Sequence, residues 1–123
     1  MSVPEFLAVY PISGETEALP VNALGPAIGY YVHVLGFSLI ARDDTTATLR
    51  RDQVTIGLAL SEQDPEAVSC YFSVRNIEAL RDEYVRKGID PTEIRLDTHN
   101  GKNFRVFFAK EPYGVCFCFG EPA

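Results

Sequence analysis

Apolar and polar residues follow two periodicities along this chain, one typical of helices and one typical of strands. Each occurs in both halves of the chain. A helical spacing of apolar residues predicts a first helix that begins near Pro26, with Gly29 and His33 facing solvent. Three residues form its inward face: Ile28, Tyr31 and Leu35. A second helix follows Asn76, a suitable N-cap, and ends before Gly88. Its inward residues are Ile77, Leu80 and Tyr84. We expect both helices to lie against a sheet.

Alternating apolar residues predict strands around these helices. The clear strands span residues 37–42, 45–50, 54–60, 69–74, 93–98, 103–109 and 115–119. Asn100-Gly101 marks a hairpin turn. Two stretches, 6–12 and 16–21, compete as the strand before the first helix. We favour 16–21, because Leu19-Pro20-Val21-Asn22 leads into the helix as Phe72 to Asn76 does.

The second half of the chain repeats the first. Residues 51–62 align without a gap on residues 110–121, and each set follows a helix that ends on glycine. We predict one α+β domain over residues 1–123, made of paired βαβββ modules that form a concave, barrel-like mixed sheet. Its parts are an N-terminal arm or extra strand (1–14), a first module (15–62), a linker (63–67) and a second module (68–121). Concave sheets commonly hold ligands.

Charge and composition exclude several partners. The net charge is −6, from 17 acidic and 11 basic residues, which argues against a nucleic-acid binder. No apolar run approaches the ~18 residues that cross a membrane, and no basic segment with an apolar run opens the chain, so we expect a cytoplasmic protein without membrane partners. Three cysteines without a Cys-x-x-Cys pair indicate reduced thiols and offer no support for structural zinc.

Short motifs, taken in order, carry a family resemblance. They are Leu19-Pro20-Val21, Ala27-Ile28 with Tyr30-Tyr31, Leu35-Gly36-Phe37, Val74 with Asn76-Ile77 and Ala79-Leu80, and Glu111-Pro112-Tyr113-Gly114. From about residue 16 to 121 the chain resembles the vicinal-oxygen-chelate superfamily, which includes glyoxalase I, extradiol dioxygenases, and fosfomycin- and bleomycin-resistance proteins. The closing Glu-Pro-Tyr-Gly and Phe119-Gly120-Glu121 are most similar to bleomycin-resistance-like members. The resemblance implies a homodimer that encloses its ligand in a shared groove.

The metal-ligand positions of the enzymes in this superfamily are altered here. By motif alignment they fall near Thr16 and Ala59 in the first module and on Ser69 and Cys118 in the second. None is a histidine or a carboxylate, and one thiolate without partners holds a metal poorly. We therefore expect no metal cofactor and lean against an enzyme.

The remaining candidate ligands have simpler interpretations. His33 lies on the polar face of the first helix, and His99 sits beside a flexible turn, where it serves better as a lid contact than as a metal ligand. We interpret Glu62 and Glu121 as solvent-exposed residues at strand ends.

Strand alternation predicts the lining of the cavity. Apolar positions such as Val54, Ile56, Val115 and Phe117 pack on helices, which leaves the alternate positions for a ligand. The predicted ligand-binding residues are Thr46, Thr48, Ala59, Ser69, Tyr71, Ser73, Arg105, Phe107, Cys116 and Cys118.

Aromatic side chains and one arginine determine which ligands this lining is expected to bind. Tyr71 and Phe107 would stack on a planar group while Arg105 fixes its polar edge. The same alternation places Val106 and Phe108 on the helix side. An ion pair across the sheet is an equally good interpretation of Arg105, and packing is the simplest interpretation of the thiols.

Three hypotheses follow from the sequence. The favoured one is a metal-free protein that binds a small organic molecule in the concave sheet and resembles antibiotic-sequestering proteins. The second is a metal-dependent enzyme of the glyoxalase or dioxygenase type with unconventional ligands such as Cys118. The third is a structural or interaction module whose cavity is filled by side chains.

Overall fold

The computed structural model describes residues 3–123, so the first two residues of the predicted arm lie outside it. The first half contains β1 (Glu5–Ser13), β2 (Leu19–Val21), α1 (Leu24–His33), β3 (Ser38–Arg42), β4 (Thr46–Arg51) and β5 (Val54–Leu60). After the short 3-10 helix Pro65–Ala67 come β6 (Ser69–Arg75), α2 (Ile77–Arg86), β7 (Arg95–His99), β8 (Lys102–Lys110) and β9 (Cys116–Pro122). Neither α-helix in residues 3–123 has the length and apolar character of a membrane span.

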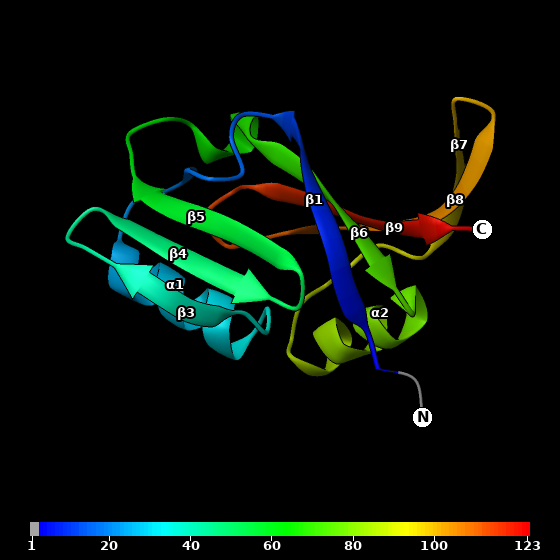
Figure 1. Ribbon diagram of the computed structural model, residues 1–123, viewed down its shortest axis with the longest axis horizontal. Helices are drawn as coiled ribbons and strands as arrows, with labels where there is room; N and C mark the ends of the chain where they lie inside the picture. Colours follow the sequence, from blue (N-terminus) through cyan, green and yellow to red (C-terminus); the bar gives the residue numbers. More distant parts are fainter. Residues whose placement is uncertain (1–2) are drawn as a thin grey trace.

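The sheets repeat one strand order, as the duplication predicts. The first sheet runs β2-β5-β4-β3, and the second contains the same sequence of strands as β6-β9-β8-β7. The pairs β2–β5 and β6–β9 are parallel, and the other pairs within these two sets of four strands are antiparallel. The α+β architecture is confirmed. The two mixed sheets stay separate and do not close into a barrel (Figure 1).

β1 extends the second sheet, although it precedes the first in the chain. It pairs antiparallel with β6, so that Val9 lies opposite Phe72. At its start Phe6 is fully buried, and its N–H donates to the Asp52 carboxylate over 2.8 Å. The backbone N–H of Gln53 donates to the Phe6 carbonyl. The arm is therefore a strand that joins the two halves.

Both helices bury the predicted faces. Ile28, Tyr31 and Leu35 are buried on the α1 side, while His33 is exposed, and α1 begins two residues before Pro26. On α2, three residues are buried: Ile77, Leu80 and Tyr84. Together with the inward faces of both sheets they form one core.

The start of α2 differs from the expectation in its chemistry. Asn76 occupies the N-cap, but its backbone is left-handed (φ 61°) and its side chain donates to the Val3 carbonyl. The carboxylate of Glu121 instead accepts from the Asn76 N–H over 3.2 Å. Glu121 is thus not the solvated strand end that its position indicated. At the hairpin tip, Asn100 and Gly101 both have positive φ, as a type I′ turn requires.

Candidate ligand-binding site

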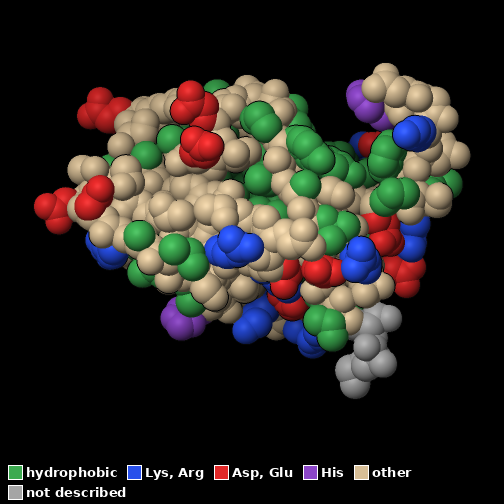
Figure 2. All heavy atoms as spheres, viewed as in Figure 1, with side chains coloured by type: hydrophobic (Ala, Val, Ile, Leu, Met, Phe, Trp, Pro, Cys, Tyr) green, Lys and Arg blue, Asp and Glu red, His purple; other side chains and the backbone are tan. Residues whose placement is uncertain are grey.

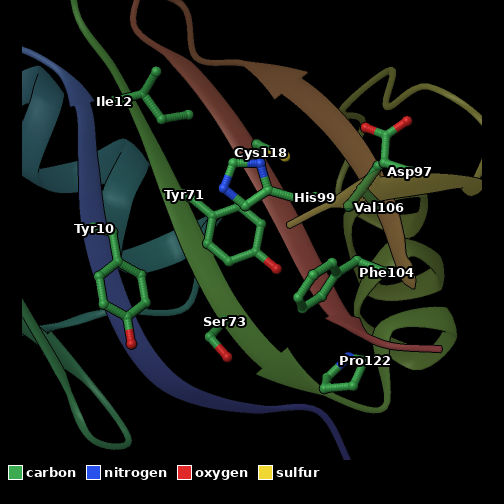
Figure 3. A pocket seen from close by; sticks show the side chains of 10 residues that line it. All are labelled: Tyr10, Ile12, Tyr71, Ser73, Asp97, His99, Phe104, Val106, Cys118 and Pro122. Atoms are coloured by element: carbon green, nitrogen blue, oxygen red, sulfur yellow. The ribbon is translucent and has the colours of Figure 1, made fainter. Parts of the chain in front are cut away.

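A hollow of about 560 Å³ lies on the second sheet, on the face turned away from α2. Figure 2 shows it as a depression edged by hydrophobic side chains, and Figure 3 shows the residues that point into it. The lining consists of Tyr10, Ile12, Tyr71, Ser73, Asp97, His99, Phe104, Val106, Cys118 and Pro122. Every strand of the sheet contributes at least one of them. The hollow thus exists because β1 and the β7–β8 hairpin extend a sheet that β6 and β9 begin.

Register brings the central side chains side by side. Tyr10 of β1 lies opposite Tyr71 of β6, which in turn lies opposite Cys118 of β9. Residues paired in this way project from the same face of a sheet. The two tyrosine rings lie 6.3 Å apart at an angle of 37°, so they present a tilted aromatic pair to the hollow.

The β7–β8 hairpin provides the wall opposite β1. It rises away from the body of the molecule (Figure 1) and turns Asp97, His99, Phe104 and Val106 toward the hollow. Asp97 lies 3.4 Å from the Arg95 guanidinium, which in turn covers the Phe108 ring at 4.9 Å. The negative charge of this wall is therefore partly balanced from outside the hollow.

The polar groups of the floor are uncharged at neutral pH. Burial raises the pKa of the Cys118 thiol to about 12, so it is protonated and a poor nucleophile. Burial, with smaller effects of Cys118 and Tyr10, also raises the pKa of Tyr71. Tyr71 and Ser73 therefore offer hydroxyl groups that donate or accept hydrogen bonds without carrying charge.

Five of the predicted residues occupy the expected face of the second sheet. Tyr71, Ser73 and Cys118 line the hollow. Ser69 and Cys116 pair with each other one step further along the same face and are half-buried just outside it. Alternation placed all five on the face of the sheet that they occupy, opposite the buried Cys70, Phe72 and Phe117.

Two predictions on β8 have the wrong orientation. Phe107 is fully buried in the core, where its ring stacks on Phe119 at 4.9 Å. Arg105 points to the start of α2 and forms ion pairs with Glu78 and Glu121. The ion pair across the sheet, the alternative interpretation of Arg105, is confirmed. β8 has large apolar residues on both faces, so its sequence alone does not show which face packs in the core and which faces the hollow.

Three predictions fall on the first sheet. Thr46 and Thr48 are exposed on β4, and Ala59 is half-exposed on β5, directly opposite Thr46. None of them lines the hollow, because that cavity belongs to the second sheet. Within residues 3–123 the two sets of predicted residues do not form one site.

Sequence reasoning missed part of the lining. Tyr10 and Ile12 were assigned to an arm of unknown position, although their alternate spacing already indicated a shared face. Asp97 lies on β7, a strand that was predicted without a face. Phe104 and Val106 lie on β8, where the alternation was predicted with the opposite phase, so Val106 lines the hollow and does not face a helix. His99, expected as a lid contact beside the turn, does line the hollow.

The hollow does not offer a metal site of the usual kind. Nowhere in residues 3–123 do three His, Cys, Asp or Glu side chains come together as metal ligands. The thiol of Cys118 is held protonated by burial, which further weakens it as a ligand. The residues present therefore do not fit the divalent ion used by metal-dependent members of the superfamily that the sequence resembles.

Comparison with known proteins agrees with this architecture. The sequence profile of the Glyoxalase/Bleomycin resistance protein/Dioxygenase superfamily matches residues 15–119. The chain belongs to this superfamily. The match runs from before β2 into β9, and all of β1 lies outside it. No curated protein sequence matches the chain significantly.

Solved structures of superfamily proteins share the fold at low identity. A bleomycin resistance determinant encoded on transposon Tn5 is 18% identical, with a TM-score of 0.76 over 89% of this chain and 97% of that one. The bleomycin-binding protein of Streptomyces verticillus, solved with copper(II)-bleomycin, is 21% identical (TM-score 0.71, 86% and 93% covered). A glyoxalase/bleomycin resistance protein/dioxygenase from Alicyclobacillus acidocaldarius is 20% identical (0.73, 85% and 87%). At such identities the likeness establishes the fold alone.

Proposed function

We propose that this protein binds a small organic molecule in the hollow of the second sheet, without a metal and without covalent chemistry. The observation that carries the proposal is the hollow itself. Its volume of about 560 Å³ falls within the range of small-molecule sites, roughly 300 to 1,000 Å³. Its lining is mostly aromatic and aliphatic with a few polar groups, which is the composition that such sites share.

The lining favours a flat ligand that is neutral or cationic. Tyr10, Tyr71 and Phe104 offer aromatic surface for a planar group, and Asp97 is the charged residue of the lining. No lysine or arginine belongs to the lining: Arg105 lies on the other face of β8, and Arg95, the partner of Asp97, lies outside the hollow. An anionic ligand would therefore meet Asp97 and find no cation in the hollow to pair with.

Binding rather than catalysis accounts best for the polar groups. The raised pKa of Cys118 leaves a neutral thiol, and the hydroxyls of Tyr71 and Ser73 have no base held against them among the hydrogen bonds of the described residues. The chain would then act stoichiometrically, as an antibiotic-sequestering protein does. The solved bleomycin-binding proteins of the superfamily support a binding role in general.

A homodimer forms the second part of the proposal. The hollow is open to solvent in the single chain (Figure 2), and a second copy would enclose the ligand more fully. The exposed face of the first sheet, with Thr46, Thr48 and Ala59, is the surface that would then cover it. In that arrangement these three residues and those of the hollow contribute to one shared groove.

Two flat dyes of opposite charge test the proposal. We expect thioflavin T, a planar cation, to bind with one site per chain in a calorimetric titration, and anilinonaphthalene sulfonate, an anion, to bind at least tenfold more weakly. Tyr71→Ala should weaken thioflavin T binding about tenfold, since an aromatic contact contributes on the order of 1 kcal/mol. His33→Ala, on the exposed side of α1, is the matched control. Equal binding by both variants, or preferred binding of the anion, would contradict the proposal.

A further inference from the structure

We propose that Gly120, which contributes no side chain to the hollow, determines its depth by letting the Tyr71 ring lie flat against β9. This inference rests on the proposed ligand site in the hollow. It makes Gly120 a positioning residue for the ligand, and it makes the pair Tyr71–Gly120 the determinant of how thick a bound group is allowed to be.

The pair is set by the register of two parallel strands. Tyr71 of β6 lies opposite Cys118 of β9, and Ser73 lies opposite Gly120. Tyr71 and Gly120 are therefore diagonal neighbours on the face that carries the hollow. The aromatic ring crosses this diagonal, as the close approach of its outer atoms to Gly120 shows.

Space for the ring explains why residue 120 has no side chain. A Cβ atom at Gly120 would lie 2.8 Å from both Cε2 and Cζ of Tyr71, and closer still to the hydroxyl oxygen. Such distances are shorter than carbon atoms tolerate. The backbone of Gly120 is not left-handed, so its conformation would accept any L residue. The ring, and not the backbone, requires glycine here.

The position of the ring depends on shape and not on a polar anchor. Among residues 3–123 the Tyr71 hydroxyl forms no hydrogen bond with another protein group, and the nearest aromatic partner is Tyr10 at 6.3 Å. The ring is therefore free to turn about its side-chain torsions when a Cβ atom is added at residue 120 beneath it. Since the sheet lies below the ring, the ring turns into the hollow (Figure 3).

This geometry separates the effect of Gly120→Ala on the fold from its effect on binding. The obstructing atoms belong to the far end of a side chain, so the folded chain relieves the contact by lifting the ring. The unfolding temperature should then fall by only a few degrees. The lifted ring occupies the volume of a flat ligand, so we expect thioflavin T to bind at least tenfold more weakly.

A double-mutant cycle tests the coupling. In a Tyr71→Ala background, Gly120→Ala should change dye affinity less than twofold, because no ring is left to lift. Gly29→Ala is the matched control, since a Cβ at Gly29 of α1 meets nothing within 4 Å. Equal losses from Gly120→Ala with and without Tyr71 would overturn the inference.

A crystal structure of the Gly120→Ala variant gives a readout that needs no ligand. Displacement of the Tyr71 ring into the hollow, with β9 in place, supports the inference. A ring that stays in place while β9 shifts away overturns it. If the ring is displaced but the wild-type protein binds neither dye, the geometric inference stands and the proposed function fails.

Discussion

Arg51 at the end of β4 and Glu83 of α2 hold each other through two parallel hydrogen bonds of 2.8 and 2.9 Å, although 32 residues separate them. Arg51 also donates to the Leu35 carbonyl over 2.7 Å, and its guanidinium lies 4.7 Å from the centre of the Phe6 ring. Its side chain is only 11% exposed. One arginine thus joins the first module, the second module and β1.

Removing this arginine should destabilise the fold markedly. We expect Arg51→Ala to cost about 2 to 3 kcal/mol in urea unfolding, because it leaves Glu83 and the Leu35 carbonyl without their partner. Arg75→Ala is the control, since Arg75 forms an ion pair with Glu5 while its side chain is 62% exposed. That substitution should cost less than about 1 kcal/mol. Equal losses would show that Arg51 does not join the modules.

The two faces of β8 should respond differently to truncation. Phe107→Ala removes a fully buried ring stacked on Phe119 and should cost about 3 to 5 kcal/mol. Phe104→Ala, from the half-buried wall of the hollow, should cost less than half of that and should weaken thioflavin T binding instead. Urea unfolding and dye titration of both variants check the assignment. The opposite pattern would mean that β8 presents its other face to the hollow.

Gly57 on β5 is required by the backbone and not by a side chain. A Cβ atom there would lie 2.7 Å from the carbonyl carbon of Glu17 and closer to its oxygen. Backbone atoms cannot turn aside as a ring does, so Gly57→Ala should destabilise the protein by about 1 to 3 kcal/mol. In the same urea series, Gly29→Ala should stabilise it by about 0.5 to 1 kcal/mol, because Gly29 lies inside a helix. A neutral Gly57→Ala would refute the close approach of Glu17.

Glu111 should make the protein less stable as the pH rises. The Tyr31 hydroxyl and the Val115 N–H donate to its carboxylate over 3.0 and 2.7 Å. Burial nevertheless raises the pKa of Glu111 above its ordinary value. A carboxyl group with a raised pKa in the folded state binds more protons there than in the unfolded chain. Its favourable contribution is complete below the unfolded pKa of about 4.3 and is lost as the pH rises through the folded value.

A Glu111→Gln variant isolates this effect. The free energy of unfolding of the variant, relative to that of the wild type, should be higher at pH 7 than at pH 4, because glutamine does not titrate. Urea unfolding at both pH values gives the difference. A difference that is constant with pH, or that favours the wild type as the pH rises, would mean that the two donors outweigh burial.

The three thiols should differ in reactivity. Cys70 and Cys118 are buried and burial raises the pKa of each thiol to about 12, whereas Cys116 is half-exposed. Ellman's reagent should therefore modify one thiol per folded chain quickly, and Cys116→Ser should remove that fast phase. A fast phase that survives in the variant would place Cys118 in contact with solvent.

The elements and their order follow from the sequence because their signals are local. Glycines end the helices at Gly36 and Gly88, and spacings of three and four residues define helix faces without reference to anything distant. The strand order could be anticipated as well, since the second half of the chain repeats the first. On β6, Cys70, Phe72 and Val74 alternate with serine and tyrosine, and this alternation of apolar and polar side chains also determined the inward face.

Contacts between distant residues decided the rest. β8 carries large apolar residues on both faces, and only packing of Phe107 against Phe119 makes one of them the core. Tyr10 faces the hollow because β1 pairs with β6 more than 60 residues away. The sequence by itself determined which segments are helices and strands, because hydrogen-bond geometry and side-chain periodicity act over a few residues. The tertiary structure alone decided where the ligand site lies, because a cavity is bounded by side chains that only the completed sheet brings together.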